Sequence, residues 1–423
     1  MKILHYLHLT ILAIFLITSC KEPDRAPDSP GTAIPGATEP GGYAAEVGLP
    51  DGAVIEKLIG PEGGVIEDST GRFRIEVPAG ALTTPVTIGL QPITNTNMHG
   101  VGTAYRLTPH GQTFQKPVKL SVHYDENDLT GTMPGALGIA YQNQENTWMA
   151  VGGAKLDTTQ RTLSVRSTHF SDWDLFESMR MVPLTKAIDP GAKVEVSVRR
   201  WKSGPGDDLA PLIPESQELA MMQATEPLDP KYITGWQLTG EGSLQASGNA
   251  GVYQAPDHIP ARNPAEVLVK LRSNGKEVGF AISKIYVAPK GISIQVADGA
   301  WRTIGNGGMN GLAGFNMINA SQDGHAVSLH WRGPRAGTFK WTFETVICTY
   351  TINGKQTYYH LYGMRPDVSK GGLTVAMAGN GEGGEMAVGH FSVPSAGLVD
   401  ATNPQDPRYT TTSMRGIFRV ELY

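Results

Sequence analysis

Apolar and polar residues alternate along most of the chain beyond residue 52. In the stretch 53–178 every second position is apolar from Phe73 to Val77, from Val86 to Leu90 and from Val118 to Tyr124. Glycine and proline interrupt this alternation about every 8 to 12 residues. A period of two, broken by such turn residues, is typical of antiparallel β-sandwiches. The pattern predicts a first β-sandwich over 53–178.

The stretch 184–289 shows the same alternation, for example from Val194 to Val198. It predicts a second, immunoglobulin-like β domain with an irregular insert over 203–231, in which residues 215–222 favour one short helix. The segment Val252 to Pro256 resembles a strand-to-turn signature of bacterial immunoglobulin-like surface repeats. That resemblance agrees with the β pattern.

A third β-rich unit is predicted over 292–423. Its strands are expected at Ile292 to Val296, Phe339 to Phe343 and Ile417 to Tyr423. In the last of these, Phe418, Val420 and Leu422 share one face, so the chain should end in a paired strand. The fold class is therefore all-β: a string of antiparallel sandwich domains.

The first residues carry an export signal. An apolar run from Leu7 to Ile17 follows Lys2 and is shorter than the roughly 20 residues of a spanning helix. It ends in Ile17-Thr18-Ser19-Cys20, which resembles the lipobox of bacterial lipoproteins. The resemblance implies that the signal peptide 1–19 is removed and that Cys20 becomes the lipidated, palmitate-bearing first residue. The protein would then be attached to the membrane through acyl chains.

The residues behind Cys20 refine this location. Lys21 and Glu22 stand where an aspartate would retain a Gram-negative lipoprotein at the inner membrane, so the outer membrane is expected, with surface exposure an open alternative. Residues 20–52 are rich in proline and glycine and poor in large apolar side chains, which predicts a disordered tether.

Composition narrows the function classes. The chain of 423 residues has a formal net charge of −5 and a pI of about 6.1, which gives no electrostatic basis for binding nucleic acid. It contains two cysteines, so with Cys20 lipidated a disulfide framework is excluded. Cys348, within an apolar run, is expected to be a small buried side chain.

Two glycine-rich segments carry a family resemblance. The segments Ile59 to Ile66 and Ile75 to Leu82 resemble the opening of a ZU-five domain, the β module of ankyrins, netrin receptors and zonula occludens proteins. The scaffold residues of this motif are Gly63, Gly64, Pro78 and Gly80. The glycines permit a tight turn and a backbone bend, and Pro78 ends a strand. These residues indicate a fold more than an activity.

The end of the same stretch offers the one chemical motif. The triplet His169-Phe170-Ser171 resembles the self-cleavage sequence of some ZU-five domains. The resemblance implies that the Ser171 hydroxyl attacks the Phe170 carbonyl while His169 takes the proton, and that water then opens the ester. The alternative is that Phe170 and its neighbours are core residues and the triplet does not cleave. His390-Phe391-Ser392 repeats the triplet outside that context.

No cofactor or resident metal is expected. The loop Gly379 to Gly384 lacks the strand and helix of a dinucleotide site, and a calcium ion at Glu382 and Glu385 is the less favoured interpretation of that loop. Trp301, Trp331 and Tyr358 raise the alternative of carbohydrate contact, although such aromatics usually lie in the core.

Three functions follow from these patterns. The first is a membrane-anchored binding, adhesion or scaffold protein that is not an enzyme and whose partner is a protein or a glycan at the cell surface. The second is a self-processing surface protein. The third is an outer-membrane component that binds or degrades carbohydrate.

Overall fold

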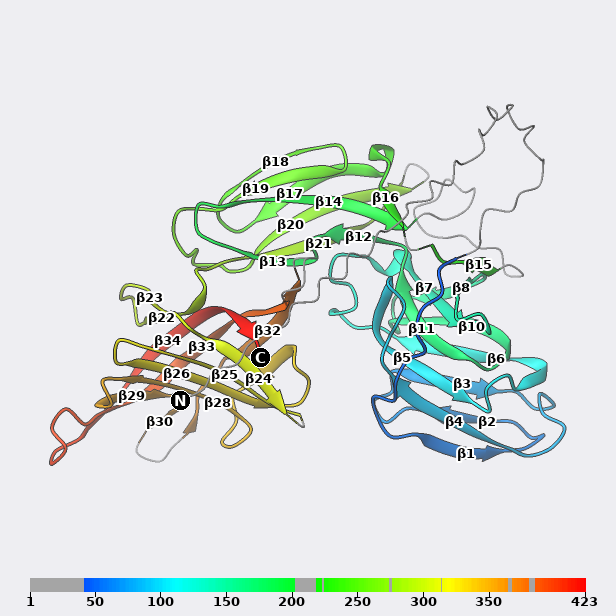
Figure 1. The fold of residues 1–423 in the computed structure, drawn as a ribbon, viewed down its shortest axis with the longest axis horizontal. Helices are drawn as coiled ribbons and strands as arrows, with labels where there is room; N and C mark the ends of the chain where they lie inside the picture. The colour runs from blue at the N-terminus through cyan, green and yellow to red at the C-terminus, as the bar shows by residue number, and fades with distance from the viewer. Residues whose placement is uncertain are drawn as a thin grey trace, which may run out of the picture. The chain divides into compact units, whose positions relative to one another are not determined.

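Most of the described chain is built from β-strands. The structure is a computed structural model that describes residues 42–201, 218–222, 224–273, 276–312, 314–363, 367–379 and 385–423. Strands account for 62% of it, and no helix there reaches seven residues. The short 3₁₀ turns described are η1 (Pro134–Ala136) and η2 (Pro230–Tyr232). The all-β prediction is confirmed (Figure 1).

The first strand group forms a sandwich of two sheets, which we call the first sandwich. The larger sheet has the order β1-β4-β5-β11-β7-β8-β15. Its strands are β1 (Ile55–Ile59), β4 (Val86–Ile93), β5 (Gly100–Thr108), β7 (Leu137–Gln142), β8 (Trp148–Val151), β11 (Asp172–Glu177) and β15 (Glu218–Ala220). The smaller sheet has the order β2-β3-β6-β10-β9. Its strands are β2 (Gly64–Glu67), β3 (Phe73–Val77), β6 (Thr113–His123), β9 (Lys155–Asp157) and β10 (Thr162–His169).

Alternating residues of both sheets build the core between them. In β3, Phe73, Ile75 and Val77 are buried and the residues between them are only partly covered, as the period of two predicts. They belong to one cluster with Leu107 of β5 and Leu175 of β11. Burying such side chains is the main favourable contribution to the stability of a sandwich.

The end of the predicted tether is ordered instead of disordered. Thr94 N–H donates to the Leu49 carbonyl at 2.8 Å, and Leu49 N–H donates to Thr94 Oγ1 at 2.8 Å. Ala44 and Pro50 form isolated bridges with Thr147 and Ile93. The segment 43–51 is therefore held by its backbone, whose hydrogen bonds composition does not reveal.

The predicted short helix at 215–222 is also wrong where the structure describes it. Residues 218–220 form β15, which pairs antiparallel with β8 of the first sandwich. Leu219 packs against a cluster that includes Trp148 and Met221. An edge position on an existing sheet provides backbone partners that an isolated helical turn lacks.

The second strand group also has two sheets. One is ordered β12-β14-β19-β18 with β16 pairing to β14, and the other is ordered β13-β21-β20-β17. Their strands are β12 (Met179–Val182), β13 (Thr185–Ile188), β14 (Lys193–Trp201), β16 (Thr225–Pro227), β17 (Ile233–Thr239), β18 (Ser243–Ser247), β19 (Ala250–Gln254), β20 (Ala265–Ser273) and β21 (Lys276–Val287). Val196, Val198, Val267 and Val269 lie in their shared core.

The third strand group, the third unit, forms one eleven-stranded sheet that bends back on itself. Its order is β23-β22-β34-β24-β25-β26-β28-β29-β33-β32-β27, and β33 also pairs with β34. Its strands are β22 (Gly291–Val296), β23 (Arg302–Ile304), β24 (Gly308–Leu312), β25 (Phe315–Gln322), β26 (His325–Arg332), β27 (Gly337–Lys340), β28 (Val346–Ile352), β29 (Gln356–Tyr359), β32 (Gly372–Gly379), β33 (Glu385–Asp400) and β34 (Arg408–Leu422). A separate hairpin joins β30 (Leu361–Tyr362) to β31 (Asp367–Val368). Figure 1 shows the third unit in yellow to red.

The core of the third unit confirms some sequence predictions and corrects one. Cys348 is a free, fully buried cysteine, and burial raises the pKa of its thiol. Phe418 and Val420 of β34 are buried as expected. The strand predicted at Phe339 to Phe343 ends at Lys340, and Phe343 is 58% exposed. The chain turns at Thr342, whose Oγ1 accepts hydrogen bonds from the N–H groups of Thr345 and Val346, while the buried Trp341 donates its indole N–H to the Ser392 carbonyl.

Candidate functional sites

Two of the three motif glycines, Gly63 and Gly80, adopt the positive φ that a tight turn or a backbone bend requires, and Gly64 does not. Gly63 has φ +80° and Gly80 has φ +76°, and a Cβ at Gly63 would collide with the Val77 carbonyl oxygen. Gly64 opens β2, while Pro78 follows the last residue of β3. Gly80 N–H donates to the Pro61 carbonyl at 2.7 Å, which ties the two motif segments together. These four residues therefore act in the scaffold.

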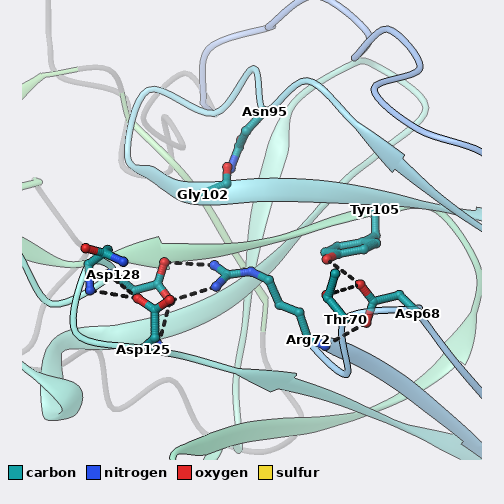
Figure 2. Close-up of polar contacts among 9 residues, drawn as sticks. Asp68, Thr70, Arg72, Asn95, Gly102, Tyr105, Asp125 and Asp128 are labelled. Atoms are coloured by element: carbon teal, nitrogen blue, oxygen red, sulfur yellow. Dashed lines mark hydrogen bonds and ion pairs between the residues drawn. The ribbon is translucent and has the colours of Figure 1, made fainter. Parts of the chain in front are cut away.

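A buried ion pair joins two loops of the first sandwich (Figure 2). The Arg72 guanidinium donates to both oxygens of Asp128 at 2.8 Å. Burial alone would lower the pKa of Arg72, but the hydrogen bond and charge of Asp128 outweigh it and raise that pKa. On the other side of Arg72, Asp68 accepts hydrogen bonds from Arg72 N–H, Thr70 Oγ1 and Tyr105 OH. These carboxylates have protein partners, so the network fixes the loops.

The triplet His169-Phe170-Ser171 lies at the joint between β10 and β11. Ser171 is 3% exposed, and its hydroxyl donates to the Gln142 carbonyl. Phe170 is buried in the core, and its carbonyl accepts the Gly111 N–H at 3.1 Å. The joint is held by backbone hydrogen bonds on both sides of the bond that cleavage would break.

His169 is engaged by groups other than Ser171. Its backbone N–H donates to Ser167 Oγ at 3.1 Å, and its ring centroid lies 4.6 Å from that of Tyr141 and 5.8 Å from that of Trp173. Burial lowers the pKa of His169, which favours the neutral form of its ring. Self-cleavage stays a prediction, and the hydrogen bonds of the described residues favour a structural joint.

Strand β11 holds the buried acidic residues Asp174 and Glu177. Asp174 is 1% exposed, and neither of its carboxylate oxygens has a hydrogen-bond partner among the described residues. Burial raises the pKa of Asp174 to about 7, and the nearby amides of Asn97 and Asn95 oppose that rise without cancelling it. Glu177 is 5% exposed, and burial raises its pKa to about 7 even though Arg180 lies 3.2 Å away. The sequence shows only that Asp174 and Glu177 are two acidic residues in one strand, and it does not show that they are buried.

The third unit also carries a groove that the sequence did not predict. It has a volume of about 430 Å³ and opens to solvent. Ten of the described residues line it, among them Tyr359, Tyr362, Gly397, Val399, Tyr409 and Thr411, and none of these ten is charged. Tyr359 is 36% exposed and Tyr409 is 64% exposed. In the sequence, the adjacent pair Tyr358-Tyr359 indicates this surface. Neighbouring side chains of a strand point to opposite faces, so when one of the two rings is buried the other points outward.

The aromatics that raised the carbohydrate alternative lie elsewhere. Trp331 and Tyr358 are buried in the core of the third unit. Trp301 is half-buried, and the Arg415 guanidinium carbon lies 5.3 Å from its ring centroid. These three side chains are held by the protein itself and do not line the groove.

Cys20 and the loop 380–384 lie outside the described residues, so lipidation and the calcium alternative stay predictions. Within the described ranges, no group of three or more histidine, cysteine or acidic side chains is placed to hold a metal ion. Those same ranges contain no helix long and apolar enough to cross a membrane. No protein-family model matches the chain, and no curated protein matches it.

The first prediction concerns the turn at Gly63. Gly63→Ala should destabilise the first sandwich by at least about 1–2 kcal/mol more than Gly71→Ala, measured by calorimetry. Gly71 is the matched control because its φ is +73° and a Cβ there would meet only the Glu67 side chain, at 3.5 Å. Equal losses from the two variants would contradict a steric role of Gly63.

The second prediction concerns the triplet. The purified chain should run as one band on a denaturing gel at neutral pH, since Ser171 and His169 are held by other partners. Ser171→Ala should give the same single band. Fragments 20–170 and 171–423 in the parent, absent from Ser171→Ala, would instead show self-cleavage.

The third prediction concerns pH. Because the pKa of Asp174 is raised in the folded state, the folded chain keeps a proton that the unfolded chain loses, and stability falls as pH rises from about 4 through about 7. A rise of this size corresponds to roughly 4 kcal/mol once the carboxyl is ionised. Asp174→Asn should therefore melt at a higher temperature than the parent at pH 8, with a smaller difference at pH 5. Glu177 acts in the same direction and remains in both proteins.

Asp51→Asn is the control for this experiment, since Asp51 belongs to the same part of the chain and is exposed. It should leave the pH dependence of melting unchanged. A parent whose melting temperature is as high at pH 8 as at pH 5 would contradict an ionisable Asp174 in this environment.

Proposed function

We propose that the protein is a membrane-anchored lipoprotein of the cell envelope that binds a partner through its tandem β domains. The observation that carries the proposal is the open groove of the third unit, where tyrosines are exposed and none of the described lining residues is charged. Large apolar side chains left open to solvent around a pocket are typical of binding sites.

The sequence supports the location. The Ile17-Thr18-Ser19-Cys20 tetrapeptide would place the lipid at Cys20, and the proline-rich residues that follow would separate the domains from the membrane. Outer-membrane placement follows from Lys21 and Glu22 on the same reasoning. A ZU-five-like first sandwich and an immunoglobulin-like second group would serve as scaffold or protein-contact modules.

Self-processing at Phe170 and Ser171 is the alternative, and it depends on the triplet alone. The contacts of His169 and Ser171 support a joint between strands more than a cleavage centre. We therefore place binding first, and the gel experiment decides the alternative.

The fourth prediction tests the anchor. Cys20→Ala should incorporate no palmitate label and should move from the membrane fraction to the soluble fraction, because no acyl chain can be attached. Cys348→Ala is the matched control, since it removes the other cysteine, which is buried in the third unit. It should stay labelled and membrane-bound. Membrane retention and labelling of Cys20→Ala at the level of the parent would contradict the proposal.

A further inference from the structure

We propose that the groove of the third unit, formed by β29, β30, β33 and β34, binds a chain of neutral sugars. The inference depends on the proposed binding function and assigns it a ligand class and a site. It differs from the carbohydrate alternative raised by the sequence, because Trp331 and Tyr358 are buried and the groove uses other side chains.

Strand register places the floor of the groove. Tyr359 of β29 lies opposite Gly397 of β33, which lies opposite Thr411 of β34. One step along the same face, Val399 lies opposite Tyr409. Side chains two residues apart share a face, so these residues line one side of the three strands. Their neighbour Tyr358 points to the other side, into the core.

The hairpin of β30 and β31 provides the wall. A Cβ at Gly397 would collide with the Leu361 carbonyl oxygen and would come within 3.1 Å of the Tyr362 Cα, so β30 crosses directly over this glycine. Tyr362 OH donates to Asp367 Oδ2 at 3.4 Å within the hairpin. The glycine therefore allows a second layer of backbone to lie close to the sheet and leaves a groove beside it.

The chemistry of the lining fits a sugar. Each tyrosine presents an apolar ring and a polar hydroxyl, and Thr411 adds another hydroxyl on the same face. A pyranose ring has the complementary character, with an apolar face of C–H groups and a rim of hydroxyls. None of the described residues that line the groove is charged, so an acidic or basic ligand would lose its hydration without gaining an ionic partner from them.

The size of the groove favours a small ligand over a protein partner. The groove of about 430 Å³ lies within the range of about 300–1,000 Å³ that small-ligand pockets occupy. The ten described residues that line it are fewer than the roughly 20–30 residues per side of a stable protein interface. These ten residues include no carboxylate, whereas most glycoside hydrolases need two. The groove therefore suits binding without hydrolysis.

The test uses the full-length Cys20→Ala chain, so that it does not depend on anchoring. Affinity electrophoresis in gels that contain dextran, laminarin, galactomannan or hydroxyethyl cellulose measures retardation by neutral glycans, and gels with polygalacturonate or heparin measure the charged class. We expect at least one neutral polymer to retard the chain and neither charged polymer to do so.

Substitutions of the lining residues test whether the retardation of the chain depends on the groove. Tyr409→Ala and Tyr359→Ala should each weaken binding by about tenfold through loss of an aromatic contact. Thr411→Trp should block the groove from an exposed position without removing a tyrosine. Tyr423→Ala is the matched control: it removes a tyrosine that is 74% exposed and lies outside the groove, and it should bind like the parent.

Three results would overturn the inference: no retardation by any of the four neutral polymers, retardation by charged polymers alone, or unchanged binding in all three groove variants. If the lipid-bearing parent still anchors and binds a protein at the envelope, the proposed function stands and only the sugar ligand is wrong. Release of the parent from membranes would contradict the proposed function separately.

Discussion

The two-faced geometry of the β-strand is the constraint on which this structure depends. Successive side chains of a strand point to opposite faces of a sheet. A strand that buries the side chains on one face must therefore have those on the other face covered by a second layer or left exposed. In β11 all six residues are buried. Trp173 and Leu175 lie in the sandwich core, while Phe176 belongs to a second cluster on the opposite face. The segment 43–51 and β15 add backbone pairing to the same sheet.

The third unit uses the second face differently. The core is filled by residues such as Tyr358, and the outward positions next to it carry Tyr359 and Tyr409 without a covering layer other than the short β30–β31 hairpin. Outward tyrosines lose little conformational freedom when they bind, because they have two rotatable side-chain bonds. A face that a scaffold would fill with polar residues is here available for a ligand.

The alternation of residues was enough to predict individual strands and the fold class. Phe73 to Val77 and Ile417 to Leu422 are paired as expected, and in the first of these segments burial follows the period of two directly. The pattern failed at residues 43–51, where proline and glycine indicate a tether but backbone hydrogen bonds hold the chain to β4. It also failed at β15, whose pairing partner β8 lies far away in the sequence.

The candidate sites depended on distances that a sequence does not contain. The His169 triplet was visible, but the partners that hold it, such as Gln142, come from other strands. Asp174 is a candidate only because it is buried, which the sequence does not show. The groove could not be predicted, because the sequence shows neither which of Tyr358 and Tyr359 points outward nor that β30 crosses Gly397.

The most direct measurement is hydroxyl-radical footprinting of the full chain with and without a neutral polysaccharide that retards it in affinity gels. The account predicts that labelling of Tyr359, Tyr362 and Tyr409 falls when the glycan is present, while labelling of Tyr423 does not change. Equal labelling of the groove tyrosines in the two states, or protection of tyrosines elsewhere in the chain, would contradict it.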